Sequence, residues 1–183
     1  SNLDVIDVDG AANFAADVTF ADGADIITAS AGTSNFRAGV NAGNSIESGG
    51  DYNTVVGDEA GTAITTGDKN TAIGYSSLAA TTTGTDNTAL GRNALAANST
   101  GDRNTASGNA ALGSNTTADS NTATGYGALF TNTTGASNTA VGDSALTANT
   151  TASNNTAVGL SALGANTTGS ENTAVGTNAL DAN

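Results

Sequence analysis

The side chains that could do chemistry are few, and they do not form a complete catalytic set. The sequence has no His and no Cys, which removes Ser-His and Cys-His nucleophile pairs and ordinary zinc ligands. It also has no GxxxxGK[ST] phosphate loop. Asp58 and Glu59 are neighbouring carboxylates, but adjacent residues of a strand point to opposite faces. We therefore expect no catalytic residues, no enzyme activity and no cofactor.

Carboxylate and amide groups suggest two further kinds of site. Asp7 and Asp9 share one face if their segment is extended, and their oxygens suit Ca²⁺. The sequence has no GGxGxD calcium repeat, so solvated turn or edge acids are the favoured interpretation and no metal site is predicted. Sequons for N-glycosylation, which turns rich in Asn and Thr also produce, begin at Asn98, Asn115, Asn132, Asn149 and Asn166.

A few larger apolar residues interrupt an otherwise small and polar sequence. Tyr75, Tyr126 and Leu160 each follow the Gly of a recurring Asn-Thr-Ala-x-Gly motif, and Phe130 lies shortly after Tyr126. Exposed aromatic rings bind sugars and protein partners, although single apolar residues are also common on protein surfaces. These four residues are candidates for contact with a cell-surface receptor or a polysaccharide.

The charge of the chain restricts its partners. The formal net charge is −13, and the basic residues Arg37, Lys69, Arg92 and Arg103 form no cluster in the sequence. Nucleic acid is not an expected partner, because its phosphates are bound by clustered Lys and Arg. No apolar run approaches the roughly 18 residues that cross a bilayer, so membrane insertion is not expected either.

A short motif recurs at a fixed spacing and organises most of the chain. Asn-Thr begins at Asn53 and returns every 17 residues (70 minus 53, for example) with no insertion, and Ala-Leu follows at positions 8 and 9 of most repeats. The asparagines at position 1 are Asn53, Asn70, Asn87, Asn104, Asn121, Asn138, Asn155 and Asn172. The glycines at position 5, where we expect a backbone that forbids a Cβ, are Gly57, Gly74, Gly91, Gly108, Gly125, Gly142, Gly159 and Gly176.

A gapless short period is typical of a solenoid. Gly and paired Thr in each repeat oppose helix, and helical repeats need about 33 residues or more per unit. We predict an all-β, parallel β-solenoid in which each coil reads strand, turn, strand, turn, with Ala-Leu on the second strand. Coils stacked about 4.8 Å apart would form a rod on the order of 38 Å long, with an Asn ladder along it.

Two different segments precede the repeat array, which covers residues 53–183. Residues 1–30 alternate apolar and acidic side chains between Asp-Gly turn signals, which predicts a shaft segment of short strands. Residues 31–52 are Gly-rich and predict a junction or an irregular first coil. The eighth repeat stops at Asn183 and the chain has no Met, so we expect a piece of a longer protein.

The core that such coils can build is thin. Each coil supplies about one Leu, one aliphatic residue at position 4 and several Ala, which is little burial to set against the ordering of a whole coil of backbone. We therefore expect several columns to pack in parallel along a common axis with closed symmetry. The Ala residues at positions 3 and 8 would leave room for a neighbouring backbone.

The motif NTAxGxxAL resembles the xxAxGxxA coil of trimeric autotransporter adhesin heads, the left-handed β-roll of the YadA type, whose coils are somewhat shorter. The longer form NTTGxxNTAxGxxAL, as in residues 132–146, is similar to repeats of bacteriophage tail fibres and related bacterial surface fibres. Residues 1–30 also resemble shaft segments of phage fibres. The resemblance implies a homotrimeric fibre on a virion or cell surface that attaches to a host. In tail fibres such arrays often precede a self-cleaving chaperone domain.

Three functions from different classes are consistent with these observations. The first hypothesis is the structural shaft or head of a homotrimeric attachment fibre, either of a phage tail or of a bacterial trimeric autotransporter-like adhesin. The second is an ice-binding β-solenoid with a flat face of stacked Thr. The adjacent Thr residues of Asn-Thr-Thr argue against it, because on a strand they would point to opposite faces. The third is a carbohydrate-degrading fibre, although such β-helices have longer coils and clustered acids.

Overall fold

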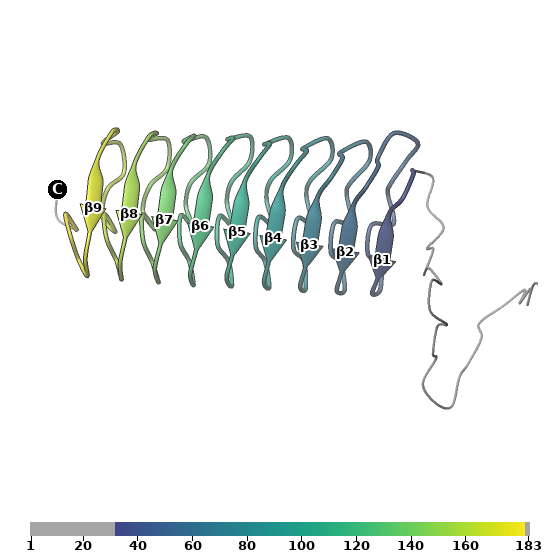
Figure 1. Ribbon diagram of the computed structural model, residues 1–183, viewed down its shortest axis with the longest axis horizontal. Helices are drawn as coiled ribbons and strands as arrows, with labels where there is room; N and C mark the ends of the chain where they lie inside the picture. Colours follow the sequence, from purple (N-terminus) through teal and green to yellow (C-terminus); the bar gives the residue numbers. More distant parts are fainter. Residues whose placement is uncertain (1–31, 182–183) are drawn as a thin grey trace, which may run out of the picture.

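A computed structural model describes residues 32–181 of the 183-residue chain. Nine strands of three residues each lie side by side in chain order as one parallel sheet (Figure 1). The strands are β1 Phe36–Ala38, β2 Thr54–Val56, β3 Thr71–Ile73, β4 Thr88–Leu90, β5 Thr105–Ser107, β6 Thr122–Thr124, β7 Thr139–Val141, β8 Thr156–Val158 and β9 Thr173–Val175. The predicted shaft at residues 1–30 lies outside the described residues.

Neighbouring strands pair so that each repeat position lies opposite itself in the next coil. Thr88 pairs with Thr105 and Ala89 with Ala106, and the same register holds from β2 to β9. The predicted parallel β-solenoid with a 17-residue period is therefore confirmed. Residues 32–181 contain no helix of the length and hydropathy that a membrane crossing needs.

Glycine at position 5 is required by the stacking of one coil on the next. These glycines have φ between +124° and +142°, a region that residues with a Cβ rarely adopt. A Cβ added at Gly91 would also lie 2.6 Å from the carbonyl oxygen of Gly108 in the following coil. The backbone that forbids a Cβ, as expected from the sequence, is thus combined at Gly91 with a close approach of the next coil.

The prediction of a second strand at Ala-Leu is wrong, because that segment is a turn. The Leu at position 9 has φ between +49° and +54° in every coil that carries it, from Leu78 to Leu180, which is left-handed backbone and not extended. The turns are still bonded between coils, since the N–H of Leu95 donates to the carbonyl of Ala111 at 3.0 Å. Each coil therefore contains one strand, closed by a hydrogen-bonded stack of turns.

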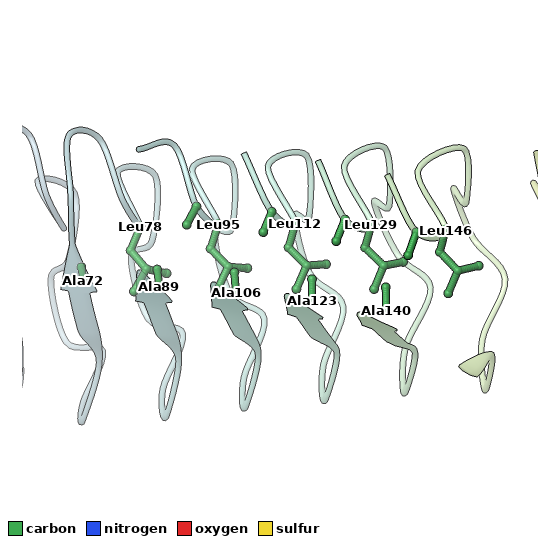
Figure 2. Close-up of a cluster of buried hydrophobic side chains, with 14 of the residues drawn as sticks. Ala72, Leu78, Ala89, Leu95, Ala106, Leu112, Ala123, Leu129, Ala140 and Leu146 are labelled. Atoms are coloured by element: carbon green, nitrogen blue, oxygen red, sulfur yellow. The ribbon is translucent and has the colours of Figure 1, made fainter. Parts of the chain in front are cut away.

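The core is a single line of small and aliphatic side chains along the inside of the rod. Strands β3 to β9 direct the Ala of position 3 inward, and the Leu of position 9 reaches toward it from the opposite turn (Figure 2). The Ala of position 8 is also buried, as at Ala94 and Ala111. The expectation that these alanines leave room for another column is therefore wrong, because they fill the interior of their own coil.

The first two coils fill the same interior with different residues. In the coil that begins at Asn53, position 9 is Gly61 and Ile64 at position 12 is fully buried in its place. A Cβ at Gly61 would meet the side chains of Val55 at 2.7 Å and Ile64 at 2.8 Å. Residues 35–52 follow the same plan, with Gly43 and Ile46. The predicted junction thus contributes a first coil, whose strand β1 pairs with β2 and which is 18 residues long (53 minus 35).

The asparagines of position 1 form a hydrogen-bonded column inside the rod, as the predicted Asn ladder requires. The amide Nδ2 of Asn104 donates to the carbonyl of Ala118 at 2.8 Å, and its Oδ1 accepts the backbone N–H of Asn121 at 3.0 Å. The same bond from backbone to side chain joins every consecutive pair from Asn53 to Asn172. The column therefore satisfies one backbone N–H per coil and fixes the register of the stack.

Candidate functional site

Carboxylates near the N-terminal end of the rod hold turns together. Asp58 Oδ1 accepts the backbone N–H of Val40 at 3.1 Å, and Glu59 Oε1 accepts Nδ2 of Asn41 at 2.8 Å. Asp58 and Glu59 lie in the turn after β2, not on a strand as considered from the sequence. Both acids bind the preceding coil, so their arrangement is explained by stacking without a role in proton transfer.

Further acids lie at position 16, in the turn before the Asn of position 1, in some of the coils, as at Asp102 and Asp119. Asp102 Oδ1 accepts the N–H of Thr85 at 2.7 Å, and Asp119 Oδ1 accepts the N–H of Asp102 at 2.8 Å. Arg103 forms an exposed ion pair with Asp119 at 3.6 Å. Within residues 32–181 no group of three or more His, Cys, Asp or Glu could hold a metal ion, and Asp7 and Asp9 lie outside that range.

The sequons coincide with a second buried Asn column at position 12. Asn98, Asn115, Asn132 and Asn149 are fully buried, and Asn166 is 3% exposed. Asn132, for example, donates its Nδ2 to Oδ1 of Asn115 at 3.1 Å and to the carbonyl of Gly135 at 2.9 Å. The amide nitrogen that a glycan would occupy is therefore inside the rod, and the pattern serves turns and stacking in the folded chain.

The outer sheet face, defined as the side chains at positions 2 and 4 of the nine strands, carries no charge. Position 2 is Phe36 in β1 and Thr in every later strand, and position 4 is aliphatic in seven of the nine strands. The exposed aliphatic residues of this face, between 36% and 71% accessible, are Ile73, Leu90, Val141, Val158 and Val175. Ser107 and Thr124 interrupt this aliphatic column. Polar residues are tolerated at position 4 because it points away from the core.

The exposed aromatic residues named from the sequence lie on a different side of the coil, beyond the position 5 glycine. Tyr75, Tyr126 and Leu160 occupy position 6 and are 50–63% exposed. The guanidinium carbon of Arg92 lies 6.0 Å from the centre of the Tyr75 ring, which is within cation–π range.

Tyr126 and Phe130 border a hollow of about 320 Å³ that Arg92, Asn93 and Asn109 also line. We call these five residues and the space between them the aromatic hollow. The two rings were named from the sequence, but the amides of Asn93 and Asn109 were not. Arg92, Asn109 and Tyr126 occupy the same position of three successive 17-residue repeats, and this spacing could have linked them. The structure brings Tyr126 and Phe130 together, whereas Tyr75 and Leu160 do not line the hollow.

No protein-family model matches this chain, and neither the curated proteins nor the solved structures compared with it include a match. The fold and the two surfaces described above therefore carry the functional argument.

Proposed function

We propose that this chain is the shaft or head segment of a homotrimeric surface fibre that projects from a particle and attaches it to a host cell. The observation that carries the proposal is the outer sheet face. A chain of net charge −13 leaves nine strands of this face without a charged side chain, while its acids lie at the turns. Exposed apolar side chains that gather on one face are typical of contact surfaces.

Other copies of the chain are the proposed occupants of that face. The rod repeats every coil, so a parallel copy in register places the same residues against one another along its whole length. Closed rotational symmetry then covers every sheet face with no unpaired end in the ring. The number three comes from the resemblance to trimeric adhesin heads and tail fibres, and the sheet faces would point to the shared axis.

The test is the molar mass in solution of the chain and of two matched variants. Val141→Glu with Val158→Glu places two charges on the outer sheet face. Thr151→Glu with Thr168→Glu places the same charges on exposed turns of the same two coils. We expect three chain masses for the parent and the turn variant, and one for the face variant. A parent of one chain mass contradicts the trimer, and a trimeric face variant contradicts the assigned interface.

The resemblance leaves two kinds of fibre, a phage tail fibre and a bacterial trimeric autotransporter-like adhesin. The two differ in the domain that comes after the repeats in the full-length protein. A self-cleaving chaperone domain indicates the tail fibre, and a membrane barrel indicates the adhesin. Sequencing the gene beyond this segment distinguishes them.

The structure also gives one observation in favour of an ice-binding solenoid. Threonines of position 2 stack in register from β2 to β9 on the outer sheet face. This row of Thr does not include the adjacent Thr residues of Asn-Thr-Thr, which lie in turns. This function needs the face free, whereas the trimer covers it. Thermal hysteresis from a protein of one chain mass would favour ice binding, and a trimer without hysteresis would exclude it.

A further inference from the structure

The aromatic hollow exists because two coils carry unusually small residues at position 7. That position is Asn93 and Ser144 at the two ends of the hollow, but Ala110 and Gly127 between them. A Cβ added at Gly127 would have no atom within 4 Å, so the space above this glycine is open. The repeat is thus interrupted at one place along the rod, and the interruption opens a hollow.

The ring of Phe130 is seated by a second small residue. A Cβ added at Gly113, one coil earlier at the same position, would lie 3.0 Å from Cε2 of Phe130. The ring therefore lies back over the glycine and faces the hollow with Tyr126, which is 63% exposed. Both rings keep an apolar surface in water that the fold itself does not use.

The polar side chains around these rings suit a polyhydroxylated ligand. The amides of Asn93 and Asn109 each donate and accept hydrogen bonds, and the guanidinium of Arg92 offers several donors. Arg92 is the single charged residue among the described residues that line the hollow. A volume of about 320 Å³ is at the lower end of the range for small-molecule sites, which is about 300–1,000 Å³.

We propose that the aromatic hollow binds one neutral pyranose ring of a cell-surface oligosaccharide. The C–H face of the sugar stacks on Tyr126 and Phe130, whose ring faces carry partial negative charge. Its hydroxyls bond to Asn93, Asn109 and Arg92. A neutral sugar is favoured because the net charge of −13 repels anions at long range. The proposal rests on the attachment role above and names the chemistry of the surface that the fibre would contact.

The test refills the hollow with a residue that the repeat already accepts. Gly127→Asn introduces the side chain found at the same position in Asn93, and the two backbones match, with φ of 60° and 58°. Ser161→Asn places the same side chain at position 7 outside the hollow and is the matched control. Tyr126→Ala removes a ring, and Leu160→Ala is its control at position 6.

The probes are the methyl glycosides of glucose, galactose, mannose and N-acetylglucosamine, titrated into the 183-residue chain and followed by NMR of the protein. We expect at least one to bind, with affinity reduced about tenfold in Tyr126→Ala, lost in Gly127→Asn and unchanged in both controls. Binding of none of the four, or binding that Gly127→Asn leaves intact, overturns the proposal.

The molar mass of each variant separates this proposal from that of the trimer. The position 6 and 7 variants should keep the mass of the parent, because they lie off the outer sheet face. A change in mass with Gly127→Asn would mean that the hollow is a contact between copies, and that result also overturns the sugar site. A parent of one chain mass that still binds a glycoside through Tyr126 would refute the fibre and leave the site standing.

Discussion

Removing a single asparagine from the position 1 column should expose how the rod depends on it. Asn104 is fully buried, and in Asn104→Ala the backbone N–H of Asn121 loses the Oδ1 that accepts it at 3.0 Å. The carbonyl of Ala118 keeps a donor, because Asn115 Nδ2 also bonds to it at 3.0 Å. One buried N–H is left without an acceptor, and the hydrogen bonds of the Asn104 amide are lost as well. We therefore expect the free energy of unfolding to fall by about 2–4 kcal/mol.

Asn115→Ala is the matched comparison in the position 12 column. Asn115 is equally buried and donates to the same carbonyl of Ala118. Its Oδ1 accepts from the side chain of Asn132 and not from a backbone N–H, so its removal leaves no backbone N–H unpaired. Nδ2 of Asn132 keeps the carbonyl of Gly135 as an acceptor, and Oδ1 of Asn98 loses its donor. Under-satisfied carbonyls are better tolerated than orphaned N–H groups. We expect a smaller cost, about 1–2 kcal/mol.

The two variants remove the same side-chain atoms from fully buried positions, so the difference between their costs reports on the hydrogen bonds. Urea midpoints measured at one protein concentration give the two free energies, because association makes stability depend on concentration. Amide exchange adds a local readout, since the Asn121 N–H should lose protection only in Asn104→Ala. Equal costs for the two variants, or a larger cost for Asn115→Ala, would refute the assigned role of the position 1 column.

Two further substitutions test the turn and the core, each beside a control. Gly91→Ala should prevent the native stack, because its Cβ would lie 2.6 Å from the carbonyl oxygen of Gly108 at a φ of +131°. Gly127→Ala, with open space around the added methyl and a φ of 60° close to the 57° of Ala110 at the same position, should cost only about 1–2 kcal/mol. Similar circular dichroism melts for the two would contradict the close approach at position 5. Leu129→Ala should cost about 3–5 kcal/mol, whereas Leu180→Ala, 45% exposed, should cost clearly less in urea unfolding, and equal losses would contradict the core assignment.

The period of the repeat predicted the stacking because it is a global constraint. Asn-Thr at a fixed spacing requires the same position to recur in each coil, and the observed register follows directly from it. Gly at position 5 and Asn at position 1 were also assigned correctly from physical reasons, since both act on the neighbouring coil. These features depend on spacing and residue type alone.

The conformation of Ala-Leu could not be predicted in the same way. An apolar pair between polar segments is typical of a strand, and Leu rarely adopts left-handed backbone. The same position in an earlier coil holds Gly61, also with positive φ. This single Gly in place of Leu was the one sign of a turn in the sequence, and Leu in all the other predicted repeats outweighed it.

The expectation that the aliphatic residue of position 4 belongs to the core is wrong, because that position is exposed in most strands, as at Val141 and Val158. Val141 and Val158 suggest a core position by type, but Ser107 and Thr124 occupy the same column. Only the placement of the position 9 Leu against the position 3 Ala shows that the strand directs position 4 outward (Figure 2). The aromatic hollow was only partly within reach, because the spacing could link its side chains but not show that Ala110 and Gly127 leave open space between them.

Association of uniform coils through the outer sheet face is the central feature of the proposed fibre. The most direct measurement is the molar mass of the chain by light scattering over a wide range of concentration. We predict a molar mass of three times the 17.5 kDa chain mass. The variant Val141→Glu with Val158→Glu should have the mass of one chain. A single chain mass at every concentration, in a protein whose circular dichroism shows it to be folded, would contradict the fibre.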